Sequence, residues 1–141
     1  MSLDPQLVHE MTQWRRHIHR FPECGFDLPL TADFVAEKLH SFGLEVVRNI
    51  GQQGIVGILK NGNSERSIGL RADMDALFIN EENTFEHCSK HEGKMHACGH
   101  DGHSAMLLGA ACHLAQNKHF DGTVYFIFQP DEEHGAGAQA M

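Results

Sequence analysis

An apolar helix followed directly by a continuous apolar strand limits the folds open to this chain. Residues 103–116, HSAMLLGAACHLAQ, are rich in alanine and leucine and are typical of a packed helix. Residues 121–130, DGTVYFIFQP, then form an apolar run that predicts a strand, buried on both faces if its sheet is parallel. Helices that alternate with strands in this way predict an α/β sandwich.

The upstream sequence supplies further elements of the same kind. Apolar residues recur at helical spacing over 5–20, and a second helical run ends at Gly43, with Thr31 as its expected cap. Three strand-like runs follow, separated by GQQ and by NGNSER, which contains an Asn-Gly turn signal. These runs occupy residues 44–50, 54–60 and 67–73.

Length, charge and cysteine content exclude several classes of protein. A chain of 141 residues fits a single domain, and a formal net charge of −8 argues against nucleic acid as a partner. The apolar runs are too short to cross a membrane, and the first residues lack the pattern of a signal peptide. The four cysteines are widely spaced, which favours reduced thiols and a cytoplasmic protein.

Histidine is unusually frequent, with 12 residues in the chain, and this raises the prospect of a metal site. Residues 93–105, GKMHACGHDGHSA, concentrate metal-ligand side chains between glycines. Ligands in open α/β sheets gather beyond the carboxyl ends of the strands, and two acidic clusters fall at such ends. We therefore expect three clusters to converge on one site: Asp73 and Asp75; Cys98, His100 and His103; and Asp131, Glu132 and Glu133.

Cys98 and His100 flank a single glycine, so that both side chains can turn toward one divalent ion. A thiolate and an imidazole suit zinc, manganese or a similar ion, and Glu132 or Glu133 could add a carboxylate ligand. One glutamate can then hold metal while the other moves a proton.

Other interpretations of these ligand-type residues are possible. A structural zinc site is disfavoured because there is no second cysteine pair, and a redox thiol because there is no C-x-x-C motif. His103 could simply open the following helix, and Asp101 could be a helix cap or could orient a ligand. Asp131 is expected to be a solvated surface charge. Cys88 and Cys112 are expected to be buried thiols, and eight histidines bystanders: His9, His17, His19, His40, His87, His91, His113 and His119.

Four stretches of the sequence resemble the M20 family of metallopeptidases. They are WRRHIHRFPECGF, LRADMDAL, FEHCSKHEGKMHACGHDGHSAMLLGAA and GTVYFIFQPDEEHGAGAQAM. The similarity is greatest to the amidohydrolase branch, which contains hippurate hydrolase, N-acyl-amino-acid amidohydrolases and plant auxin-conjugate hydrolases. The resemblance implies an α/β/α sandwich around a mostly parallel mixed sheet, as in the catalytic domain of zinc exopeptidases.

The resemblance also implies the role of each site residue. Cys98 and His100 match ligands of a two-metal centre, with the thiolate able to bridge both ions, and Glu133 matches a further metal ligand. Glu132 matches the general base, and Asp75 matches an aspartate beside the metals. The cofactors would be two divalent ions of zinc, manganese, cobalt or nickel.

The sequence departs from the family pattern in two ways that affect this interpretation of the site and the domain. Phe78 stands where the family usually has proline, which changes a loop beside Asp75 and removes no ligand. Family members are also much longer, with two more histidine ligands downstream and a smaller lid domain that often forms the dimer. We therefore expect residues 1–141 to be the amino-terminal part of the catalytic domain, inactive alone, from a homodimeric or tetrameric parent.

The expected activity is metal-dependent hydrolysis of the amide bond of N-acyl amino acids, such as hippurate-like or N-acetyl-amino-acid substrates. The resemblance carries this expectation. A dipeptidase of the same family and a non-catalytic metal-binding relative remain as alternatives. The acyl group, the amino acid and the native metal are not specified by the sequence.

Overall fold

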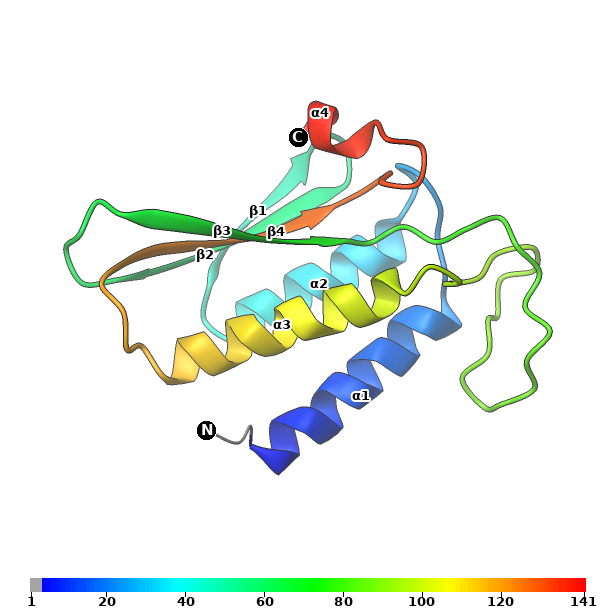
Figure 1. The fold of residues 1–141 in the computed structure, drawn as a ribbon, viewed down its shortest axis with the longest axis horizontal. Coiled ribbons are helices and arrows are strands. Elements are labelled where there is room, and N and C mark those ends of the chain that lie inside the picture. Colours follow the sequence, from blue (N-terminus) through cyan, green and yellow to red (C-terminus); the bar gives the residue numbers. More distant parts are fainter. Residues whose placement is uncertain (1–3) are drawn as a thin grey trace.

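The computed structural model describes residues 4–141 (Figure 1). Its elements follow in the order α1 (Pro5–Arg20), α2 (Pro29–Ser41), β1 (Glu45–Ile50), β2 (Gly54–Asn61), β3 (Ser67–Asp73), α3 (His100–Gln116), β4 (Gly122–Gln129) and α4 (Gly137–Ala140). The helical run over 5–20 and the strand-like runs are thus confirmed within one or two residues. None of the helices in this part of the chain is both long and apolar enough to cross a membrane.

The four strands form one mixed sheet in the order β1-β2-β4-β3. β1 pairs antiparallel with β2 across the short turn between them, and β2 pairs antiparallel with β4. β3 and β4 are joined through α3 and pair in parallel, from Ser67 opposite Thr123 to Asp73 opposite Gln129. The α/β class and the mixed sheet are therefore confirmed, although within residues 4–141 only one of the pairings is parallel.

The helices lie mainly on one side of the sheet (Figure 1). α2 contacts β1 and β2, α3 contacts β3 and β4, and α1 packs against α3 from outside. The hydrophobic core fills the space between these helices and the sheet, and includes Val35, Leu39, Leu108, Phe126 and Phe128. α4 lies against the opposite side of the sheet (Figure 1).

β4 is buried mainly on the face that meets the helices. Phe126 and Phe128 are fully buried there, whereas Tyr125 points the other way and is 37% exposed. Burial on both faces was expected only for a parallel sheet, and this condition is not met, because β4 pairs antiparallel with β2. In the described residues only the short α4 lies on the far side. Its apolar sequence reflects one packed face and one partly open face.

The two ends of α2 are capped in different ways. The helix begins at Pro29, and Thr31 lies inside its first turn, so the prediction that Thr31 caps it is wrong. The carboxylate of Glu23 instead accepts hydrogen bonds from the backbone N–H groups of Leu30 and Thr31, at 3.2 and 2.8 Å. Gly43 ends the helix as expected, with φ of +82° and its N–H bonded to His40.

Candidate metal centre

The start of α3 brings the two central ligand candidates together. Gly99 precedes the helix with φ of +97°, a left-handed conformation that suits glycine. The helix begins at His100, three residues before the apolar run suggested, because the left-handed turn already directs the chain into it. His100 is buried and Cys98 is exposed. The ligand atoms of Cys98, His100 and Glu133 all lie within 4.8 Å of one another.

Both adjacent glutamates face the imidazole of His100. The Nε2 atom of His100 lies 3.6 Å from Oε2 of Glu132 and 3.7 Å from Oε1 of Glu133. The side chain of Glu133 is 19% exposed and that of Glu132 is 40% exposed. Oε1 of Glu133 is buried and has no hydrogen-bond partner among the described residues. A buried carboxylate oxygen of this kind needs a cation or a donor beside it.

Asp75 contacts two members of this cluster, His100 and Glu133. Its side chain is fully buried, and Oδ2 accepts the backbone N–H of Glu133 at 3.0 Å. The Nδ1 atom of His100 lies 2.9 Å from the backbone oxygen of Asp75, so that Nε2 faces the glutamates. Burial alone would raise the pKa of Asp75, but hydrogen bonds from His100 and from the backbone of Glu133 and Glu132 lower it overall.

The protonation of His100 and Cys98 reflects the negative charge around them. Burial opposes the charged imidazole, but Asp75 and Asp73 outweigh it and raise the pKa of His100 to about 9. A hydrogen bond to Glu133, burial and nearby carboxylates raise the pKa of the Cys98 thiol. Both groups therefore hold protons in a metal-free site, and a divalent ion would replace them. The donor set of one sulfur, one nitrogen and carboxylates fits such an ion.

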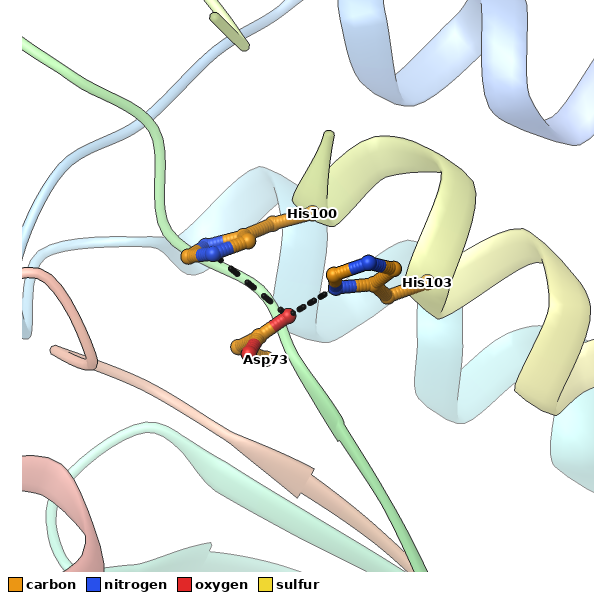
Figure 2. A group of neighbouring side chains, drawn as sticks. All are labelled: Asp73, His100 and His103. Atoms are coloured by element: carbon orange, nitrogen blue, oxygen red, sulfur yellow. Dashed lines mark hydrogen bonds and ion pairs between the residues drawn. The ribbon is translucent and has the colours of Figure 1, made fainter. Parts of the chain in front are cut away.

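A second group of potential ligands adjoins the first and contains Asp73, His100 and His103 (Figure 2). Oδ1 of Asp73 lies 2.7 Å from Nδ1 of His103 and 3.7 Å from Nε2 of His100. Arg71 donates to the other oxygen of Asp73 at 3.0 Å. Asp73 and His103 belonged to the clusters expected to converge, and the structure places both beside His100.

Two aspartates differ from what the sequence suggested. Asp131 is buried, so its interpretation as a solvated surface charge is wrong. Its backbone has φ of +47°, which turns the side chain inward, where Oδ1 lies 2.7 Å from Nδ1 of His134. Asp101 is not the cap of α3, because that position is Gly99.

Asp101 instead joins a buried network that sequence reasoning missed. Its Oδ2 accepts Nε–H of Arg15 at 3.0 Å and lies 2.8 Å from Nδ1 of His19. The Nε2 atom of His19 lies 3.1 Å from Oε1 of Glu81. We call these four residues the His19 network. It joins α1 and the loop before α3 to the residue next to His100, and His19 is therefore not a bystander.

His96 is a further buried histidine near the network. It is 4% exposed, and neither ring nitrogen has a partner among the described residues. Burial lowers the pKa of His96 to about 4, which keeps the imidazole neutral. The sequence gives no signal for the contacts of His19, because its partners lie far away along the chain. His96 lies in the ligand-rich stretch 93–105, but nothing in that stretch predicts its burial. Cys24, Cys88, Cys98 and Cys112 are all free thiols, as expected, although Cys88 is only partly buried.

Comparison with known proteins relates this site to a family. Hippurate hydrolase of Campylobacter jejuni is 50% identical over 144 residues, covering 100% of this chain and 37% of that relative. N-acyl-L-amino acid amidohydrolase of Geobacillus stearothermophilus is 46% identical, covering 96% of this chain and 37% of the relative. The chain thus spans little more than a third of the length of these relatives.

A solved structure has nearly the same fold over this region. The YXEP protein of Bacillus subtilis, a dinuclear metal binding peptidase from the M20 family, matches with a TM-score of 0.92 and 36% identity. The match covers 97% of this chain and 39% of that protein. The family model for peptidase family M20/M25/M40 matches residues 69–141, which is more than half of the chain. The matched region includes Cys98, His100, Glu132 and Glu133. The chain therefore belongs to peptidase family M20/M25/M40.

Proposed function

We propose that the protein containing this chain hydrolyses the amide bond of N-acyl amino acids with the help of divalent metal ions. The observation that carries this proposal is the cluster of Cys98, His100 and Glu133 with Glu132 beside it. Three relatives support the substrate class: the hippurate hydrolase, the N-acyl-L-amino acid amidohydrolase and an IAA-amino acid hydrolase of Arabidopsis thaliana, 44% identical over 97% of this chain.

Cys98, His100 and Glu133 would hold the metal. Their donor atoms lie within 4.8 Å of one another, and the unpartnered Oε1 of Glu133 supports a cation at this position. Two ions of zinc, manganese, cobalt or nickel, when bound, would polarise the amide carbonyl and lower the pKa of a water molecule. The YXEP protein, with its dinuclear site, supports the number of ions.

Glu132 acts as the general base in this proposal. Its side chain is 40% exposed and reaches the same imidazole as Glu133, so it lies at the edge of the cluster where water and substrate can approach. It accepts a proton from the attacking water and then delivers it to the amine that leaves. Asp75 holds His100 and the backbone of Glu133 in place, so its contribution is to position the ligands.

The rest of the catalytic machinery would lie in the remainder of the protein. We propose that residues 1–141 form the amino-terminal part of the catalytic domain, and that further ligands and a lid and dimerisation domain belong to the full-length protein. The coverage of the relatives by this chain, near 37%, supports this division. Four free thiols suit a reducing compartment, and we place the protein in the cytoplasm on that ground.

A peptidase activity is the second candidate. A thermostable carboxypeptidase of Saccharolobus solfataricus is 43% identical over 95% of this chain, which favours peptide substrates for some relatives. The full-length protein, loaded with metal, should be assayed against hippurate, N-acetyl amino acids and dipeptides. Faster turnover of the acyl amino acids, abolished by chelation and restored by metal, is expected. Preference for dipeptides supports the second candidate, and no hydrolysis of either class contradicts both.

A further inference from the structure

A cavity on the helical side of the molecule contains none of the residues of the metal centre. Its volume is about 380 Å³, and it is an open cavity lined by α1, α2 and the loop before α3. The side chains that define it are Arg16, His17, Arg20, Lys38, Glu86 and His87, and we call it the basic pocket. The loop is held to α1 here, since Lys90 donates its backbone N–H to Arg20 at 2.8 Å.

Most of the positively charged side chains of the basic pocket have no close ion-pair partner among the described residues. Arg16 and Lys38 make no ion pair within residues 4–141. Arg20 donates to the backbone oxygen of Glu86 at 3.3 Å but lies 3.8 Å from its carboxylate, and that side chain is 94% exposed. The Nε–H of Arg20 is buried without a partner in the described part of the chain. In a chain of net charge −8, this concentration of cations is a local exception.

Aromatic rings hold the cations in position before any ligand arrives. The Nζ atom of Lys38 lies 5.5 Å from the ring centroids of both Trp14 and Phe34, in cation–π geometry. The imidazole of His17 stacks on Phe34, with the centroids 4.3 Å apart. Because these contacts restrict the side chains, less conformational freedom is lost when they bind a ligand.

The structure assigns the basic pocket as a binding site for a small oxyanion, either inorganic phosphate or an organic carboxylate. Three permanent cations and two imidazoles line a cavity large enough for such a ligand, and Glu86, which is 94% exposed, is the one carboxylate among the lining side chains. Charge-assisted hydrogen bonds from guanidinium and ammonium groups are the contacts that proteins use for these anions. Flat aromatic walls would add affinity for a carboxylate that carries a ring.

The two imidazoles provide direct reporters of binding. Burial lowers the pKa of His17, and the charges of Arg20 and Lys38 lower it further. Burial also lowers the pKa of His87, together with Arg16, His19, Arg15 and Arg20. An anion in the pocket would offset the arginine and lysine charges, so both imidazoles should become easier to protonate when it binds.

The test is an NMR titration of the full-length protein with ¹³C-labelled histidine. Inorganic phosphate and benzoate are added separately at fixed ionic strength, and the imidazole resonances of His17 and His87 are followed with pH. Saturable shifts of both, with raised pKa values, are expected. Tighter binding of benzoate identifies a ring-bearing carboxylate, and tighter binding of phosphate identifies a compact oxyanion. Absence of a saturable shift with either anion overturns the proposal.

Variants separate a site from general attraction. Arg16→Gln and Lys38→Met should each weaken binding about tenfold, because each removes a charged donor. Arg66→Gln removes an equal charge at an exposed position outside the pocket and should leave affinity within about twofold. Thermal unfolding and metal content of each variant establish that the fold is intact. Equal affinity in all three variants contradicts the assignment.

Discussion

Replacement of His19 by glutamine should destabilise the protein strongly, although His19 is remote from the metal ligands in sequence. Its ring lies between two carboxylates, with Nδ1 2.8 Å from Asp101 and Nε2 3.1 Å from Glu81. The three side chains are 4%, 1% and 3% exposed. Carboxylates accept hydrogen bonds, and the two ring nitrogens of His19 are the groups that face them.

The magnitude follows from what remains after the substitution. A glutamine has one amide and cannot donate to both carboxylates across this span, so at least one of them loses its contact to residue 19. Arg15 still donates to Asp101, and Asn83 and Ser89 still donate to Glu81. A hydrogen bond to a charged group typically contributes about 1.5–3 kcal/mol. The donors that remain offset part of this loss, although the side chain of Arg15 is 49% exposed, so a destabilisation of about 2 kcal/mol is expected. A loss of about 2 kcal/mol lowers Tm by roughly 4–8 °C in a protein of about 150–250 residues, and by less in the longer full-length protein.

Calorimetry of the full-length wild type and His19→Gln at pH 7 measures this loss. His9→Gln is a matched control, because His9 lies on the same helix and is exposed. Since Asp101 directly follows His100, the metal content of His19→Gln should fall as well. A Tm equal to that of the control, within the effect of an ordinary surface substitution, would refute the stabilising role assigned to His19 in this network.

Three further predictions concern the neighbourhood of the site. Cys98→Ser should lower metal content measured by elemental analysis, because a hydroxyl replaces a thiolate ligand; unchanged occupancy would remove Cys98 from the ligand set. Gly99→Ala should lower the free energy of unfolding by about 1–2 kcal/mol. Gly99 has a left-handed backbone and no atom lies within 4 Å of an added Cβ, so the backbone conformation is the only source of this loss. An unfolding free energy equal to that of the wild type would contradict this. Burial would raise the pKa of Glu81, but hydrogen bonds from Asn83, Ser89 and His19 hold it below the usual 4.5. The stability it contributes is therefore present above pH 4.5 and lost as pH falls through its lower folded value, so the Tm difference between wild type and Glu81→Gln should shrink only in acid.

Local patterns predicted the elements well because each element carries its own periodicity. The helix over 5–20 and the three strand-like runs needed no information from distant residues, and the family motif around Cys98 and His100 was specific. The strand order was not predictable in this way. The placement of β4 between β2 and β3 depends on packing across the whole sheet.

The missed features depend on contacts between residues far apart in sequence. His19 and Asp101 are separated by 82 residues, and nothing in either neighbourhood indicates the pairing. Asp131 looks like a surface charge in QPDEEHG, and only its left-handed backbone turns it inward. The early start of α3 was missed because CGHDGH has no apolar period, although that stretch positions the site.

The division of labour between Glu132 and Glu133 is the central claim, and kcat of Glu132→Gln at full metal occupancy tests it most directly. The amide is similar in size but cannot accept a proton, so the variant should keep its metals and lose about a hundred- to ten-thousand-fold in kcat. Glu133→Gln is the matched control and should lose metal, since a neutral oxygen replaces the buried carboxylate beside His100. If Glu132→Gln retains wild-type kcat, or if it loses metal while Glu133→Gln keeps it, the proposed mechanism is contradicted.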